Sequence, residues 1–149
     1  MLAGLARDGG LYTPDVTPRW TPDAFAALAG LAYPQVAARV MAPFAAPDFD
    51  EATLREMADD AYRGFRHAAK APLAQIGDNL FVLELFHGPT LAFKDFAMQF
   101  LGRAMNRALT LRNAHATILG ATSGDTGAAA IEAFGGAERT DVFLSLIHI

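Results

Sequence analysis

Two stretches of this chain repeat one pattern, in which an apolar run leads into a turn of small residues and then into a helix. In the first, residues 81–86 lead to a break at Gly88-Pro89, and helical periodicity begins at Asp95. In the second, residues 116–120 lead into Ala121-Thr-Ser-Gly-Asp-Thr-Gly127, which opens a helix of small residues. Such strand–turn–helix units are typical of α/β folds, whose parallel strands carry functional loops at their carboxyl ends. We therefore expect a parallel sheet with both turns at one edge.

The first seventy residues predict a small helical unit. Thr21-Pro22-Asp23 combines a side-chain cap, a proline at the first helical position and an early acid, so a helix should start there and end at Gly30. A second helix should open at Tyr33-Pro34, followed by a loop with prolines at 43 and 47. Asp48 and Glu51 resemble a capping box for a third helix, which should run to about residue 66. The side chains expected in the core are Val36, Val40, Met41, Leu54, Met57, Ala58, Ala61, Tyr62 and Phe65.

The pattern changes after Ala71-Pro72, where we place a domain boundary. Residues 1–74 should form the helical domain, and residues 75–149 should begin a parallel-sheet domain. Gly77-Asp-Asn79 is a turn signal before an expected strand at residues 80–86. The helix expected from Asp95 carries Phe96, Ala97, Phe100, Leu101, Ala104, Met105, Ala108 and Leu109 on its core face. A strand at residues 116–120, a helix at residues 126–134 closed by Gly135-Gly136, and a strand at residues 141–149 should follow.

Composition and charge exclude several classes of protein. A net charge of −4 with twelve scattered basic residues argues against nucleic-acid binding, which needs clustered Lys and Arg. The absence of cysteine excludes disulfides, thiolate metal sites and a cysteine nucleophile, and the four histidines lack metal-ligand spacing. No apolar run reaches the roughly 18–20 residues that span a bilayer, and residues 1–7 do not resemble a signal peptide. We expect a cytoplasmic protein with no metal, membrane or nucleic-acid partner.

Lys94 follows the first turn and has phenylalanines on both sides in the sequence. Burial and a nearby helix N-terminus both disfavour the ammonium form, so the neutral, nucleophilic amine would be more populated. A neutral amine is the form that condenses with an aldehyde to give an imine. The spacing alone favours a structural alternative, in which Lys94 extends to solvent and pairs with Asp95 or Asp125.

The turn Ser123-Gly-Asp-Thr-Gly127 at the start of a helix is typical of a small-anion site. Free backbone N–H groups, two hydroxyl groups and glycines that permit close approach would suit a carboxylate or a phosphate. The Gly-Lys-Ser/Thr ending of a nucleotide-binding loop and the dinucleotide fingerprint are both absent. An alternative left open is that Asp125 only caps the helix. His87 is a third candidate, although a lone histidine at a turn is more often a structural hydrogen-bonding group.

Taken together, Glu84-Leu-Phe-His-Gly-Pro-Thr-Leu-Ala-Phe-Lys-Asp-Phe96 and Ala121-Thr-Ser-Gly-Asp-Thr-Gly-Ala128 resemble the threonine synthase family. Gly4-Leu-Ala-Arg-Asp-Gly-Gly-Leu-Tyr-Thr-Pro14 resembles the N-terminal motif of the branch with an added helical domain. The likeness covers nearly the whole chain. It implies the tryptophan-synthase-β-like fold and pyridoxal 5′-phosphate as cofactor. The implied activity is that of a carbon–oxygen lyase acting on phosphate, which converts O-phospho-L-homoserine and water to L-threonine and phosphate.

The resemblance also implies roles for individual residues. Lys94 would form the imine with the cofactor and act as base and acid, with Phe93 and Asp125 beside the cofactor. Asp125 stands where many relatives of this fold have asparagine near the cofactor's ring hydroxyl. The residues that would bind the substrate are His87, Thr90, Thr122, Ser123, Gly124, Asp125 and Thr126, of which the last five match the loop that closes on its α-carboxylate. The resemblance favours the imine function of Lys94 over the structural alternative.

Members of the family are several hundred residues long, and their glycine-rich loop for the cofactor phosphate would lie beyond residue 149. We therefore expect an inactive N-terminal fragment, whose residues 142–149 depart from the family pattern. Two alternatives stay open. One is another pyridoxal-phosphate lyase or dehydratase of the same fold, and the other is a non-catalytic small-anion-binding module that uses the turn at residues 123–127 alone. The sequence does not predict the oligomeric state.

Overall fold

The computed structural model of the chain describes residue 2 and residues 4–146. The chain divides into two compact units, Met1–Ala58 and Asp59–Ile149. The second unit begins inside a helix, so the segment between residues 59 and 74 groups with the later residues. The division into a helical domain at residues 1–74 and a catalytic domain at residues 75–149 remains a prediction. The predicted α/β class is confirmed, because helices and a parallel sheet are both present.

The first unit contains short helices that start at local caps. α1 (Pro22–Ala26) begins where predicted, because Thr21 Oγ1 accepts a hydrogen bond from Ala24 N at 3.2 Å. The helix is shorter than expected, since residues 27–30 form a turn that ends at Gly30, with φ +75°. α2 (Tyr33–Ala45) starts at Tyr33-Pro34, as predicted.

Two expectations about helix boundaries in this unit are wrong. Pro43 lies inside α2 rather than in the loop that follows it. α3 (Glu51–Tyr62) is capped by Asp50 and not by Asp48. The Asp50 carboxylate accepts a hydrogen bond from Thr53 N at 2.8 Å, a contact that requires the acceptor to stand directly before the helix.

The core of the first unit is made of apolar side chains from alanine to phenylalanine in size. Its buried members are Ala38, Phe49, Leu54, Met57 and Ala58. The prediction that Val40 belongs to this core is wrong, because Val40 is 40% exposed. Val40 lies two residues after Ala38 on α2 and therefore on roughly the opposite side of the helix.

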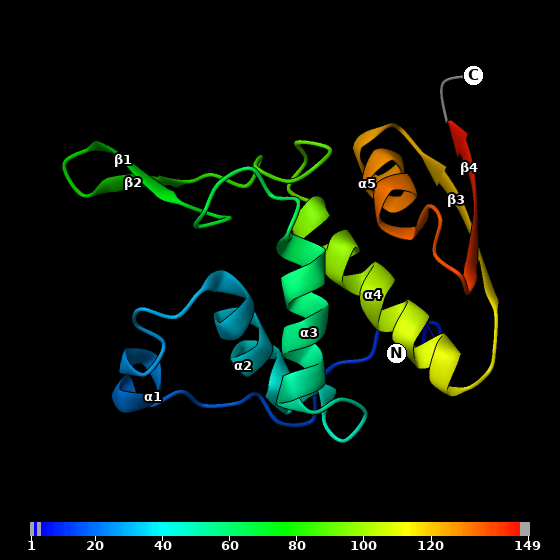
Figure 1. The fold of residues 1–149 in the computed structure, drawn as a ribbon, viewed down its shortest axis with the longest axis horizontal. Coiled ribbons are helices and arrows are strands. Elements are labelled where there is room, and N and C mark those ends of the chain that lie inside the picture. Colours follow the sequence, from blue (N-terminus) through cyan, green and yellow to red (C-terminus); the bar gives the residue numbers. More distant parts are fainter. Residues whose placement is uncertain (1, 3, 147–149) are drawn as a thin grey trace. The chain divides into compact units, whose positions relative to one another are not determined.

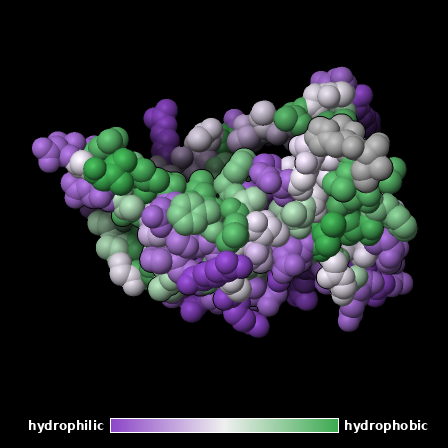
Figure 2. All heavy atoms as spheres, turned by 90° about the horizontal axis from the view of Figure 1, so that it is seen from above, coloured by the Kyte–Doolittle hydropathy of each residue, from purple (hydrophilic) through white to green (hydrophobic). Residues whose placement is uncertain are grey.

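The second unit contains an antiparallel hairpin, which corrects one expectation. β1 (Leu73–Gly77) pairs antiparallel with β2 (Leu80–Leu83) across the predicted turn, where Asn79 adopts φ +55°. The first apolar run is therefore not part of the parallel sheet, because a two-residue connection permits only antiparallel pairing. Most side chains of the hairpin are exposed, and Figure 2 shows hydrophobic residues gathered at the surface over it.

A βαβ unit follows in the chain. β3 (Ala116–Thr122) and β4 (Thr140–Leu146) run parallel, and α5 (Asp125–Phe134) connects them along one face of the sheet (Figure 1). On that face Ile118 and Val142 pack against a buried cluster that includes Phe134. On the other face Leu119 is 84% exposed. The last predicted strand is confirmed as far as Leu146, and residues 147–149 lie outside the described residues.

α4 (Asp95–Leu111) starts where predicted and packs against α5 (Figure 1). Its buried positions are Asp95, Gln99, Gly102, Ala104 and Leu109. Ala97 and Leu101, which were expected on the core face, are exposed because α4 buries the side that carries Gln99 and Gly102 instead. Of the helices in the described part of the chain, none is both long and apolar enough to cross a membrane.

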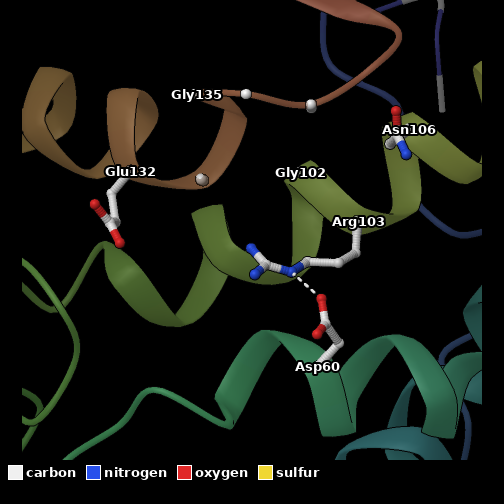
Figure 3. Close-up of a pocket in the computed structure, with 9 residues that line it drawn as sticks. Asp60, Gly102, Arg103, Asn106, Glu132 and Gly135 are labelled. Carbon is white, nitrogen blue, oxygen red and sulfur yellow. Dashed lines mark hydrogen bonds and ion pairs between the residues drawn. The ribbon is translucent and has the colours of Figure 1, made fainter.

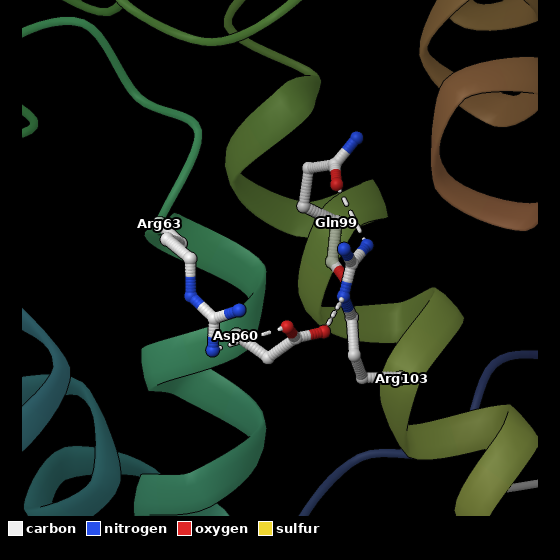
Figure 4. Close-up of polar contacts among 4 residues, drawn as sticks. All are labelled: Asp60, Arg63, Gln99 and Arg103. Atoms are coloured by element: carbon white, nitrogen blue, oxygen red, sulfur yellow. Dashed lines mark hydrogen bonds and ion pairs between the residues drawn. The ribbon is translucent and has the colours of Figure 1, made fainter.

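A polar network joins the last turn of α3 to α4 within the second unit. Arg103 Nε donates a hydrogen bond to Asp60 Oδ2 at 2.9 Å, and Arg103 Nη1 donates to Gln99 Oε1 at 2.7 Å (Figure 4). Asp60 Oδ1 also lies 3.5 Å from Arg63 Nη2. The two carboxylate oxygens of Asp60 therefore each face one arginine.

Candidate functional site

The first predicted turn is built around a buried carboxylate. Asp95, the first residue of α4, is fully buried, and it accepts hydrogen bonds from Thr90 N at 2.8 Å and from Thr90 Oγ1 at 2.7 Å. A Cβ on Gly88 would lie 2.4 Å from Asp95 Oδ2, so this approach requires glycine. The N-terminus of a helix favours negative charge, which suits the carboxylate. The turn from Gly88 to Thr90 is thereby fastened to α4.

Aromatic packing also restrains the first turn of α4. The rings of Phe65 and Phe96 meet edge to face with centroids 4.8 Å apart. The Tyr62 hydroxyl donates a hydrogen bond to Phe96 O at 3.1 Å. Since Phe96 comes two residues after Lys94, these contacts restrain the backbone next to the predicted imine-forming lysine.

Lys94 directly precedes α4 and is half-buried. Its Nζ atom lies 4.2 Å from the centroid of the Phe93 ring, a cation–π distance. Within the described residues Lys94 forms no ion pair, so the structural alternative of pairing with Asp95 or Asp125 is not found. The carboxylate of Asp95 is instead bound to Thr90.

A largely apolar cavity of about 510 Å³ opens beside Lys94. Its lining consists of Leu85, Phe93, Lys94, Phe96, Ala97, Met98 and Thr126. Lys94 contributes an amine to this lining, and Thr126 belongs to the first turn of α5. The volume lies within the range of roughly 300–1,000 Å³ that is usual for small-molecule sites. The two predicted junctions therefore meet at one cavity.

Thr122 organises the second predicted turn. It is the last residue of β3 and pairs with Leu146 of β4, so the turn leaves the carboxyl end of a parallel strand. Thr122 Oγ1 accepts hydrogen bonds from Gly124 N at 3.2 Å and from Gly127 N at 3.0 Å. Gly124 precedes α5 with φ +148°, a backbone conformation that L side chains rarely adopt. Asp125 lies in the first turn of α5 and does not cap it, so that alternative is wrong.

Most of the remaining predicted residues of this turn are exposed, and part of the turn lines a second cavity. Ser123, Asp125 and Thr126 are exposed, whereas Thr122 is buried. The N–H groups in the first turn of a helix have no acceptor within the helix, so those of Asp125 and Thr126 can donate to an anion. A second cavity, of about 470 Å³, is lined by Thr90 of the first turn and by Thr122, Gly124 and Asp125 of the second. The turn can therefore offer backbone N–H donors to a small anion.

His87 is held in place by hydrogen bonds and ring contacts with nearby residues. Its Nε2 atom lies 2.7 Å from Glu84 Oε2, and its backbone oxygen accepts a hydrogen bond from Arg66 N at 2.8 Å. Its ring also contacts those of Phe86 and His67, with centroids 4.7 and 5.0 Å away. His87 is not among the described residues that line the two cavities. Its predicted contact with substrate stays a prediction.

A further hollow contains none of the predicted site residues. It measures about 240 Å³, and the residues labelled around it in Figure 3 are Asp60, Gly102, Arg103, Asn106, Glu132 and Gly135. Asp60 and Arg103 bind each other at its edge. The hollow belongs to the packing of α3, α4 and α5.

Three features near the first turn were not predicted from the sequence. Asp95 was considered only as a partner of Lys94, although a glycine and a hydroxyl residue shortly before it are a usable signal for a carboxylate-bound turn. Glu84, three residues before His87, was not recognised as its partner. Leu91 adopts φ +65°, which no sequence signal indicates because leucine rarely enters the left-handed region.

Comparisons with known proteins agree on one family. A family model described as "Threonine synthase N terminus" matches residues 1–62. The threonine synthase of Pseudomonas aeruginosa is 49% identical over 148 residues, which cover 99% of this chain and 32% of that protein. The threonine synthase of Schizosaccharomyces pombe is 41% identical, over 97% of this chain and 30% of that protein. The chain thus spans about a third of the length of these relatives.

Solved structures give the same result for the fold. The crystal structure of PLP-bound threonine synthase from Brucella melitensis aligns with a TM-score of 0.94 and 55% identity, over 97% of this chain and 31% of that one. Threonine synthase from yeast aligns with a TM-score of 0.90 and 37% identity, over 97% and 31% of the two chains.

Proposed function

We propose, on the premise that this chain matches the N-terminal third of threonine synthases in sequence and in fold, that it carries part of a threonine synthase active site. The reaction is the conversion of O-phospho-L-homoserine and water to L-threonine and phosphate, a carbon–oxygen lyase reaction with pyridoxal 5′-phosphate as cofactor. One observation carries the proposal. Lys94 and the start of α5 line the same cavity, so an imine-forming amine and an anion-binding helix start lie together.

The residues around Lys94 fit the cofactor. The amine has no carboxylate partner within the described residues, and the cavity beside it has a largely apolar lining that would exclude water from an aromatic aldehyde. Lys94 Nζ would hold the cofactor covalently, with Phe93 beside it and Asp125 near its ring hydroxyl. When bound, pyridoxal phosphate supplies an electron-withdrawing ring that stabilises substrate carbanions.

The turn at residues 122–126 would bind the substrate's α-carboxylate. The free N–H groups of the first turn of α5 and the hydroxyl groups of Ser123 and Thr126 would donate to it, while Thr122 and Gly124 keep the turn in shape. The carboxylate of Asp125 opposes an anion there, so these donors must outweigh it.

The first turn would supply the remaining polar contacts. Thr90, which lines the second cavity, and His87, held by Glu84, would bind polar groups of the substrate. Lys94 Nζ would take protons from substrate carbon atoms and return them, because a neutral amine accepts a proton and an ammonium donates one. The partner is a small molecule, and the proposed location, expected from the sequence, is the cytoplasm.

Reductive labelling tests the proposal. The purified protein, Lys94→Ala and Lys70→Ala are titrated with pyridoxal phosphate, reduced with borohydride and mapped by peptide mass. Lys70 is the matched control because it is the chain's other lysine. We expect a visible imine absorbance and a reduced adduct on Lys94, both kept in Lys70→Ala and lost in Lys94→Ala. Equal labelling of both lysines, or none, would overturn the proposal and leave a small-anion module as the better explanation of the second turn.

A further inference from the structure

The loop that leads to Lys94 contains a strained residue between two fixed ends. Leu91 adopts φ +65°, in the left-handed region, where the Cβ of an L-residue comes too close to a carbonyl oxygen. Conformations of this kind persist only where the surrounding structure imposes them, and they concentrate at functional sites. The loop must therefore be held in place by contacts stronger than its own preference.

The carboxylate of Asp95 supplies those contacts. It binds both Thr90 N and Thr90 Oγ1, and the residue that follows Thr90 is Leu91. Two backbone hydrogen bonds between residues three apart close the rest of the loop, with Leu91 N donating to Gly88 O at 3.3 Å and Asp95 N donating to Ala92 O at 3.0 Å. These bonds hold Thr90 and Asp95 together, and Lys94 is one of the residues of the loop that they close.

We propose that Asp95 is a positioning residue, which clamps Thr90, keeps Leu91 left-handed and so aims Lys94 Nζ at the apolar cavity before any cofactor binds. The inference rests on the proposed imine function of Lys94 and deepens it. Asp95 does not itself line the cavity, so it acts through the loop and not on the reacting atoms. Because Asp95 is buried, water does not compete for its hydrogen bonds to Thr90, and the helix N-terminus stabilises its negative charge.

A purely structural role for Asp95 makes different predictions. Loss of a structural contact would lower the stability of the unit as a whole and would leave the chemistry of Lys94 unchanged in molecules that remain folded. A clamp acts locally, so its loss frees the loop and slows reaction at Lys94 while the helices stay formed. Leu91 distinguishes the two roles, because glycine enters the left-handed region about as readily as the right-handed one.

The first measurement needs no cofactor. Hydrogen exchange of the Thr90 amide is compared in the unmodified protein, Asp95→Ala and Asp95→Asn, with the buried Ala129 amide of α5 as internal reference. Asparagine keeps one acceptor for Thr90 N and should preserve much of the protection. We expect exchange at Thr90 to rise about tenfold or more in Asp95→Ala relative to Ala129. Equal acceleration at both amides would overturn the clamp.

The second measurement is the rate of imine formation at Lys94, followed by absorbance and confirmed by reduction and peptide mapping. We expect it to fall roughly 10- to 100-fold in Asp95→Ala, as for a misplaced reacting group, and less in Asp95→Asn. Adding Leu91→Gly to Asp95→Ala should restore part of the rate. An unchanged rate in folded Asp95→Ala, or no recovery with Leu91→Gly, would overturn the proposal.

Thr90→Val keeps the test decisive if Asp95→Ala does not fold, because it removes only the hydroxyl half of the clamp. We then expect a smaller fall in the rate at Lys94, and an unchanged rate would again overturn the proposal. A failure of the proposed imine function would give a different experimental result from a failure of the clamp. In that case the unmodified protein itself gives no adduct on Lys94.

Discussion

Replacing Gly127 with alanine should break the hydrogen bonds that hold the second turn. The new Cβ would lie 2.3 Å from Thr122 Cγ2, about 1.1 Å inside the 3.4 Å at which ordinary contact begins. Thr122 must therefore turn its side chain away. In doing so, its Oγ1 atom leaves the N–H groups of Gly124 and of residue 127.

The size of the effect follows from these contacts. Each of the two hydrogen bonds contributes about 0.5–1.5 kcal/mol, and alanine in a helix recovers up to about 1 kcal/mol relative to glycine. Thr122 is buried, so its displaced hydroxyl also risks remaining unpaired, which adds to the loss. We expect the free energy of unfolding to fall by about 1–2 kcal/mol.

Urea unfolding followed by circular dichroism measures this loss, and a second substitution tests its cause. Serine at position 122 keeps the hydroxyl oxygen but lacks Cγ2, so the double variant Thr122→Ser, Gly127→Ala has room for the new Cβ. It should be more stable than Gly127→Ala alone, while Thr122→Ser alone changes little. If the double variant is no more stable than Gly127→Ala, the clash with the methyl group is not the cause.

Two further predictions concern other parts of the chain. Arg103→Ala should lower the free energy of unfolding by about 1–3 kcal/mol, because Gln99 Oε1, in a residue only 4% exposed, loses its donor. Asp60→Ala should lower the free energy of unfolding by less than about 1 kcal/mol, since the ion pair between Asp60 and Arg103 is partly exposed. Equal losses of stability for the two variants in urea unfolding would show that the buried contact of Arg103 with Gln99 contributes nothing extra. Burial raises the pKa of the Tyr33 hydroxyl above its usual 10.0, so the folded state favours the neutral form. The free energy of unfolding should therefore be unaffected by this group below pH 10 and should fall as the pH rises from there toward the raised pKa. The fall should be less steep in Tyr33→Phe, which has no hydroxyl to ionise. If the free energy of unfolding falls equally steeply with pH in both proteins, other groups cause the fall.

The sequence predicted those features of the fold that depend on neighbouring residues. The starts of α1, α2 and α4 follow from caps and prolines within a few positions, so they could be found without knowledge of the fold. The partner of a strand is a different kind of property. The apolar run at residues 80–86 suits a buried parallel strand and an exposed hairpin equally well, and the choice depends on the preceding strand Leu73–Gly77.

The candidate site divides in the same way. Lys94 is assigned its role by the resemblance of the motif at residues 84–96 to one family, because its spacing alone favours a structural role, whereas the turn at residues 122–126 suits a small anion by its residue types alone. The clamp between Thr90 and Asp95 was not predicted, because a sequence gives the spacing of two residues and not the direction of their side chains. The left-handed Leu91 could not be predicted at all, since it is imposed on the residue by its neighbours.

The close approach of Gly88 to Asp95 also limits how this turn can change during evolution. A Cβ at position 88 would lie 2.4 Å from Asp95 Oδ2 and 2.5 Å from Asp95 Cβ, so truncating the carboxylate to alanine does not make room. Position 88 therefore stays closed to larger residues while any side chain remains at position 95. A lineage that no longer needed the carboxylate could lose it in one step, but it would keep the glycine. In such a lineage the Cβ of the replacing residue, and no longer the carboxylate, would be the reason that position 88 must be glycine.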